Sequence, residues 1–85
     1  MSWHVFVRSA AEADLDALDP TDQLSVSEEL FRWVNDGPPR ETPRDVFGVG
    51  MFDDDMRAGF RVTYVVVEPQ NNILIIRIRK VSPAS

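Results

Sequence analysis

The side chains that most clearly suggest a chemical function are five cations in the last third of the chain. Arg57 and Arg61 lie at the start of one apolar run, and a second apolar run contains Arg77, Arg79 and Lys80. Guanidinium and ammonium groups bind carboxylates and phosphates through charge-assisted hydrogen bonds. This segment therefore predicts an anion-binding surface.

The basic segment belongs to an acidic protein. The formal net charge is −5, and residues 1–36 hold eight acidic residues against two basic ones. In residues 56–85 only Glu68 opposes the five cations. An acidic total weakens long-range attraction to nucleic acid. Because the charges are segregated along the chain, that total does not exclude a nucleic-acid role for the basic end.

Length and composition limit the classes of protein. Eighty-five residues indicate one domain, 1–85, and a core so small that a stabilising protein partner is expected. Cysteine is absent and His4 is the single histidine, so we expect no metal site and no cofactor. The sequence shows no secretory signal and no run of about 18 apolar residues. We therefore expect a cytoplasmic protein with no membrane partner.

The first half predicts a strand followed by a two-helix hairpin. Residues 3–7 are rich in aromatic and β-branched side chains, which is typical of a strand. Ser9 and Glu12 have the spacing of a helix capping box. Asp19, followed by a proline, predicts the N-cap of a second helix, and Gly37 predicts its end. Both helices carry an apolar stripe and an acidic face.

The middle of the chain gives weaker signals. Residues 37–45 contain three prolines and predict a surface loop, and residues 45–52 predict a weak strand. Residues 53–55 are three consecutive aspartates, which we interpret as a solvated turn. They lack the alternating ligand spacing and the closing Glu of a calcium loop.

Residues 56–67 and 73–81 predict a β-hairpin, because both are strand-like and the segment between them is rich in turn residues. One register keeps charge out of the core and leaves one face almost wholly apolar, against which the helices pack. The predicted outer pairs are Arg61 with Arg79, Thr63 with Arg77, Val65 with Ile75 and Val67 with Ile73.

The predicted fold class is therefore α+β. The order is one strand, a two-helix hairpin and an antiparallel β-meander (β-α-α-β-β-β), with the helices on one face of the sheet. On the outer face, Arg61 and Arg79 are like charges directly opposite each other, which destabilises a sheet unless an anion offsets them. That anion is either an acidic residue of this chain or an external ligand.

This order of elements resembles the RelE/ParE superfamily of type II toxin–antitoxin toxins. The most specific stretch is Gly59–Val67, which looks like the family's strand with an aromatic residue, an arginine and a tyrosine. Residues 73–80 resemble its last basic strand. Residues 13–18 and 37–39 are weaker matches.

The resemblance implies a growth-inhibiting toxin, of the kind associated with plasmid stabilisation, that a cognate antitoxin neutralises. RelE-like members inhibit translation as metal-independent endoribonucleases that cleave ribosome-bound mRNA, whereas ParE-like members inhibit DNA gyrase. In a RelE-like protein, Arg61 and Arg79 would be catalytic, and Arg57, Arg77 and Lys80 would bind the substrate. The apolar group Val65, Val67, Ile73 and Ile75 is the predicted surface for the antitoxin or for homodimer formation.

Two departures from the family pattern leave a non-catalytic protein-interaction module open as the alternative. RelE-like members usually carry lysines on the second strand. The corresponding residues of this chain, 46–51, are apolar residues and glycines and include no lysine. They often end with a Tyr or His that transfers protons. Here Tyr64 is predicted to face the core and His4 lies on the first strand, so the basic face has no evident general base.

Overall fold

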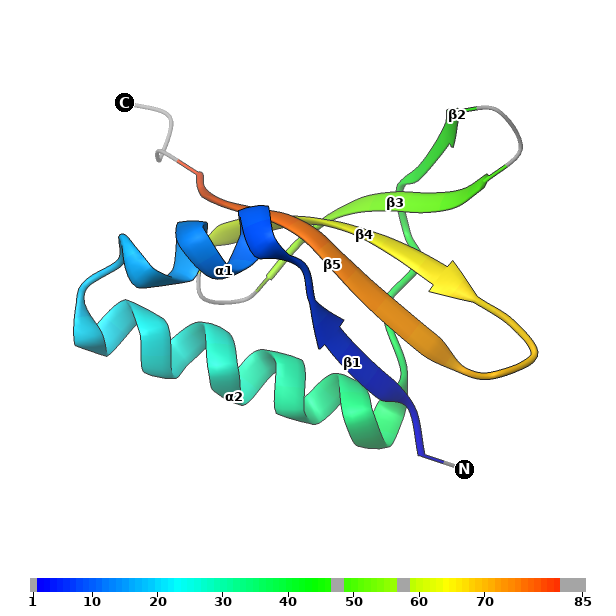
Figure 1. Ribbon diagram of the computed structural model, residues 1–85, viewed down its shortest axis with the longest axis horizontal. Coiled ribbons are helices and arrows are strands. Elements are labelled where there is room, and N and C mark those ends of the chain that lie inside the picture. The colour runs from blue at the N-terminus through cyan, green and yellow to red at the C-terminus, as the bar shows by residue number, and fades with distance from the viewer. Residues whose placement is uncertain (1, 47–48, 57–58, 82–85) are drawn as a thin grey trace.

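The computed structural model describes residues 2–46, 49–56 and 59–81. Two helices cover one face of a sheet of five strands (Figure 1). The elements are β1 (His4–Val7), α1 (Ser9–Asp16), α2 (Pro20–Asp36), β2 (Pro43–Val46), β3 (Val49–Asp55), β4 (Phe60–Val67) and β5 (Asn72–Lys80). The predicted α+β class and the placement of both helices on one face are confirmed. None of the described helices is long and apolar enough to span a membrane.

The sheet order is β1-β5-β4-β3-β2, so β5 and β4 lie at its centre. β1 pairs in parallel with β5, and all other neighbours are antiparallel. The α1–α2 hairpin carries the chain away from β1 and back to β2 at the opposite edge of the sheet (Figure 1). This topology brings the first strand of the chain beside the last.

The helix boundaries follow local sequence signals, with one exception. Asp19 caps α2 as predicted, and its Oδ1 accepts a hydrogen bond of 3.0 Å from the backbone N–H of Asp22. Gly37 ends α2 with a φ of +86°, and a Cβ there would lie 2.8 Å from the indole nitrogen of Trp3. The capping box predicted for α1 is wrong, because Ser9 is already helical and the N-cap, Arg8, makes no side-chain cap bond.

The middle of the chain folds into two strands where the sequence predicted one. β2 begins at Pro43, inside the predicted loop, and pairs with β3 from Pro43–Phe52 to Val46–Val49. The aspartates predicted as a turn are the last three residues of β3. Their partners on β4 are Thr63, Val62 and Arg61 in that order.

The predicted register of the β4–β5 hairpin is confirmed only at the end far from its turn. Arg61 pairs with Arg79 and Thr63 with Arg77, as expected. An irregularity between Thr63 and Tyr64 then leaves Ile76 without a partner, and Tyr64 pairs with Ile75. Beyond this bulge each residue of β5 faces the side opposite to the predicted one.

The core lies between the helices and β4 and β5. Its completely buried side chains come from the helix-facing positions of both strands, from α2 and, at Ala11, from α1. The largest are Tyr64, Phe60, Ile73, Ile75, Val26 and Val62. The core position predicted for Tyr64 is confirmed. Its ring packs edge-on against Trp33, with 4.9 Å between centroids, and stacks on Phe52 at 5.4 Å.

Candidate functional site

The sheet surface that α1 and α2 leave uncovered is here called the open face. Because side chains alternate along a strand, the register assigns residues to this face two apart. Its charged half comprises Asp53 and Asp55 on β3, Arg61 and Thr63 on β4, and Arg77 and Arg79 on β5. These side chains form two rows across three neighbouring strands.

The first row runs from Asp55 through Arg61 to Arg79. Nε of Arg61 donates to Oδ1 of Asp55 at 2.9 Å, and both side chains are more than half exposed. The neighbouring carboxylate raises the pKa of Arg61 above its ordinary value, so this guanidinium stays charged. Within residues 2–46, 49–56 and 59–81, the exposed guanidinium of Arg79 makes no hydrogen bond or ion pair. The row therefore presents one paired arginine and one unpaired arginine.

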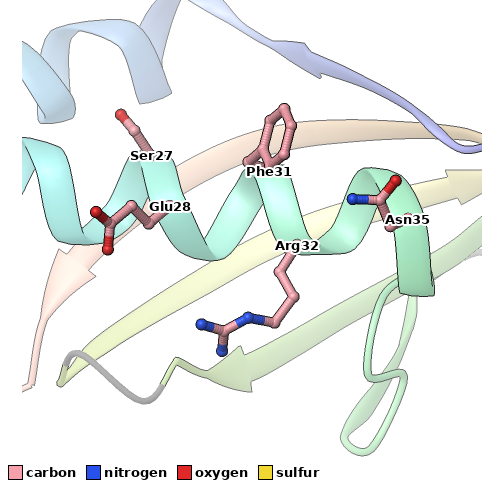
Figure 2. Close-up of a pocket in the computed structure, with 5 residues that line it drawn as sticks. All are labelled: Ser27, Glu28, Phe31, Arg32 and Asn35. Carbon is pink, nitrogen blue, oxygen red and sulfur yellow. The ribbon is translucent and has the colours of Figure 1, made fainter.

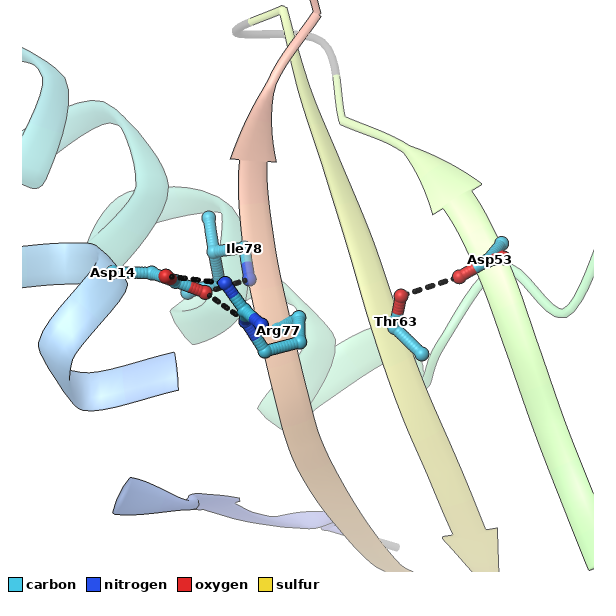
Figure 3. A network of polar contacts seen from close by, with 5 residues as sticks. All are labelled: Asp14, Asp53, Thr63, Arg77 and Ile78. Carbon is cyan, nitrogen blue, oxygen red and sulfur yellow. Dashed lines mark hydrogen bonds and ion pairs between the residues drawn. The ribbon is translucent and has the colours of Figure 1, made fainter. Parts of the chain in front are cut away.

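The second row runs from Asp53 through Thr63 to Arg77, and its side chains are engaged in contacts within the chain (Figure 3). Asp14 of α1 accepts hydrogen bonds from Nε and Nη2 of Arg77 at 2.8 and 3.1 Å, and from the backbone N–H of Ile78 at 2.9 Å. Oγ1 of Thr63 donates to Oδ1 of Asp53 at 2.5 Å. Arg77 lowers the pKa of Asp14, and Asp14 raises the pKa of Arg77. This pair attaches α1 to β5.

The structure brings together three of the five predicted cations. Arg61, Arg77 and Arg79 lie on adjacent positions of the open face. Lys80 does not join them, because it pairs with Phe60 on the helix-facing side, and its Nζ lies 3.3 Å from Oδ2 of Asp22 on α2. Arg57 lies outside the described residues.

The other half of the open face is apolar. Beyond the bulge it presents Phe6 of β1, Met51 of β3, Val65 and Val67 of β4, and Leu74 of β5. Phe6 is 49% exposed and Val67 is 36% exposed. The prediction that Ile73 and Ile75 belong to this surface is wrong, because both are completely buried in the core. Leu74 lies on this surface instead, because the bulge reverses which residues of β5 face each side.

Sequence reasoning missed the two carboxylates of the charged half. β3 pairs with the strand that carries Arg61 and ends in residues 53–55, for which the sequence predicted a solvated turn. A signal was present, because Asp55 and Arg61 flank a short segment that contains Gly59, whose φ is +86°. Oppositely charged residues on either side of a tight turn are a typical cross-strand pair.

Asp54, between these two carboxylates, faces the core. Its side chain is almost completely buried and accepts a hydrogen bond from the hydroxyl of Tyr64. It also accepts the backbone N–H groups of Glu41 and Thr42 at 3.2 and 2.8 Å. Burial and the hydrogen bond to Asp54 raise the pKa of Tyr64 far above its ordinary value. The Tyr64 hydroxyl therefore keeps its proton and cannot act as a general base.

No other region of the described chain gathers reactive groups. In that part of the protein no three His, Cys, Asp or Glu side chains are arranged to hold a metal ion. A hollow of about 480 Å³ lies on the outer surface of α2, away from the sheet, lined by Ser27, Glu28, Phe31, Arg32 and Asn35 (Figure 2). It is shallow and open, and its side chains diverge from one another. The open face remains the candidate site.

Comparison with known proteins supports the architecture strongly. No family model matches the chain, and no curated protein matches it. Among solved structures, a chain of the toxin–antitoxin complex RelBE2 from Mycobacterium tuberculosis superposes with a TM-score of 0.79 at 21% identity. That alignment covers 94% of this chain and 99% of the other.

Two further structures agree. The isolated RelE toxin of E. coli gives a TM-score of 0.74 at 14% identity, over 99% of this chain and 89% of that one. A chain of the archaeal RelE–RelB complex from Pyrococcus horikoshii gives a TM-score of 0.69 at 17% identity. That alignment covers 99% of this chain and 100% of the other. At these identities the likeness establishes the fold, so the predicted RelE-like fold is confirmed.

Proposed function

We propose that this protein is the toxin of a type II toxin–antitoxin system and that it cleaves ribosome-bound mRNA with the charged half of its open face. The observation that carries this proposal is the cross-strand pair Arg61–Arg79 on an uncovered sheet, with Arg79 unpaired among the described residues. The RelE fold supports the same assignment.

The arrangement suits a phosphate. Residues directly opposite on antiparallel strands lie about 5 Å apart, so two guanidinium groups can contact one phosphate group from neighbouring strands. Fixed cations beside a phosphate stabilise the negative charge that develops in the transition state of RNA cleavage. Arg61 and Arg79 would perform this function, with Arg77 available if its pair with Asp14 opens.

Induced expression in bacteria tests the proposal. We expect growth arrest with cleaved mRNA on stalled ribosomes, and relief of the arrest by Arg61→Ala or Arg79→Ala. Arg32→Ala is the control, because Arg32 is a half-exposed arginine of α2 that pairs with Glu29 and lies outside the charged half. Normal growth while soluble wild-type protein accumulates would contradict the toxin assignment.

The apolar half of the open face is the proposed antitoxin surface. Contiguous exposed apolar side chains on a small domain mark a protein-binding site. Val65→Asp would place a charge at its centre, and we expect it to abolish capture of the co-expressed antitoxin. Leu24→Asp is the control, since Leu24 is 60% exposed on α2. Equal loss of binding in both variants would contradict this assignment, and a change in mass of the free toxin with Val65→Asp would indicate a homodimer there.

A second candidate function has its own supporting observation. Asp55 and Asp14 neutralise two of the three arginines of the charged half, and a neutral surface is better suited to a protein target than to RNA. This favours a ParE-like inhibitor of gyrase or a non-catalytic interaction module. Gyrase-linked DNA breaks with intact mRNA would support the ParE-like function, and absence of both effects would support the interaction module.

A further inference from the structure

Cleavage of RNA by its own 2′-hydroxyl requires a group that accepts the hydroxyl proton. Tyr64 is buried on the helix-facing side, and its hydroxyl donates a hydrogen bond to Asp54. His4 pairs with Asn72, at the opposite end of β5 from Arg79. Arginine does not lose its proton in proteins. Among the described residues of the charged half, only the carboxylates of Asp53 and Asp55 can take this part.

The two carboxylates differ in availability. Asp53 is half-buried and accepts the Thr63 hydroxyl at 2.5 Å, and it has a further interaction. Asp55 has a side chain that is 60% exposed, and only its Oδ1 is used, by Arg61. Within the described residues its Oδ2 has no hydrogen-bond partner. Asp55 can therefore accept a proton without giving up the contact that orients it.

The position of Asp55 also suits the geometry of the reaction. Asp55, Arg61 and Arg79 occupy one row on β3, β4 and β5, and neighbouring strands are about 4.8 Å apart. A phosphate held above Arg61, in the middle, has Asp55 on one flank and Arg79 on the other. An in-line displacement places the attacking oxygen and the leaving oxygen on opposite flanks of phosphorus in the same way.

We propose that Asp55 is the general base of this site, a role that rests on the proposed ribonuclease function. Its Oδ2 removes the proton of the 2′-hydroxyl as the 2′-oxygen forms a bond to phosphorus. The bond from phosphorus to the 5′-oxygen breaks, and that oxygen takes a proton from water. The products are a 2′,3′-cyclic phosphate and a free 5′-hydroxyl. Arg61 binds the non-bridging oxygens, Arg79 stabilises the negative charge that develops on the 5′-oxygen, and Asp55 returns its proton to solvent.

The competing interpretation is that Asp55 only neutralises Arg61, and it makes the opposite prediction. Asp55→Asn preserves an oxygen that accepts from Nε of Arg61, but it removes both the negative charge and the proton acceptor. If Asp55 only neutralised Arg61, the variant would bind phosphate better and cleave faster. If Asp55 is the base, kcat falls while KM stays equal or decreases.

The experiment measures cleavage of a short mRNA on purified ribosomes. We expect Asp55→Asn to lower kcat by about 10²- to 10⁴-fold, the range for loss of a general base. Asp16→Asn is the control outside the charged half, because Asp16 is exposed at the end of α1, and we expect its kcat to stay near the wild-type value. An mRNA with a 2′-deoxynucleotide at the scissile position must resist the wild-type protein, because it lacks the attacking oxygen.

Chemical rescue separates a base from a structural residue. Asp55→Gly opens space beside Arg61, and we expect added formate to restore part of kcat in this variant but to leave the kcat of Asp16→Gly unchanged. Wild-type cleavage combined with an unchanged or faster Asp55→Asn would overturn the base assignment alone. A wild-type protein that cleaves no mRNA would overturn the ribonuclease proposal and the base assignment together.

Discussion

Asp54 and Asp55 are consecutive residues of β3, yet they lie in two different regions of the molecule. Asp54 is 3% exposed on the helix-facing side and accepts three hydrogen bonds, from Tyr64, Glu41 and Thr42. Asp55 is exposed on the open face, and within the described part of the chain its side chain bonds to Arg61 alone. The same side chain is structural on one face and available for chemistry on the other.

The contrast shows that alternate residues of β3 have different functions, because their side chains point to opposite faces of the sheet. The helix-facing region fixes the segment 40–42 to the sheet through Asp54, and Tyr64 accepts the backbone N–H of Arg40 at 2.8 Å. On the open face the Arg61–Asp55 ion pair is more than half exposed, and exposed ion pairs contribute little to stability. Substitutions in the helix-facing region should therefore change folding, and substitutions on the open face should change function.

The largest expected effect is that of Asp54→Ala. It leaves the buried hydroxyl of Tyr64 and two backbone N–H groups without their acceptor, and we expect it to lower the free energy of unfolding by about 3 kcal/mol. Urea denaturation followed by tryptophan fluorescence measures this, since Trp33 packs on Tyr64. Asp55→Ala is the paired control, and equal destabilisation by both would contradict the division between the two faces.

Tyr64→Phe should have a smaller effect in the same region. It keeps the ring that packs on Trp33 and Phe52, but it leaves Asp54 without its hydroxyl donor and Arg40 N–H without its acceptor. We expect a loss of about 1–2 kcal/mol in the free energy of unfolding. A double-mutant cycle with Asp54→Ala should show strong non-additivity. Additive losses would mean that the two groups act independently.

The fold was predictable because its signals are local and repeated. The apolar stripe of α2, its Asp19 cap and the alternation in β4 indicate their elements directly, and the polar end of the hairpin fixes its own register. The order of elements then determines the packing of helices on one face. The RelE-like fold was predicted because this order of elements resembles that family, and the solved structures bear it out.

The site was predictable only in part, for two physical reasons. The bulge opposite Thr63 and Tyr64 adds one residue to β5, and no residue near Ile76 signals it; this error moved Ile73 and Ile75 to the wrong face. Aspartate is rare in strands, so residues 53–55 indicated a turn. Their strand is stabilised by partners distant in the sequence, such as Thr63 and Tyr64.

A weaker effect is expected at Asp14, which links α1 to the charged half through Arg77 and the N–H of Ile78. Arg77 lowers the pKa of Asp14 below its ordinary value of 3.8. A carboxylate with a lowered folded-state pKa stabilises the fold above the unfolded pKa, and this contribution is lost as pH falls through the folded value.

Asp14→Asn should therefore lower the free energy of unfolding by about 1 kcal/mol at neutral pH. The difference from wild type should shrink as the pH falls below 3.8, because the wild-type carboxyl then becomes protonated as well. Urea denaturation at several pH values measures both curves. A difference that stays constant at acidic pH would show that the charge of Asp14 contributes nothing.

The smallest effect on folding is expected from Arg79→Ala. Arg79 is exposed and makes no hydrogen bond or ion pair among the described residues, although its charge helps to lower the pKa of Asp14. Its removal therefore leaves no hydrogen-bonding group unsatisfied, and it relieves the repulsion from Arg61 opposite. We expect an unchanged urea midpoint together with loss of growth arrest. A variant that is both stable and inactive would place the function of Arg79 in ligand binding, whereas a variant that unfolds would show that the open face contributes to stability in the same way as the core.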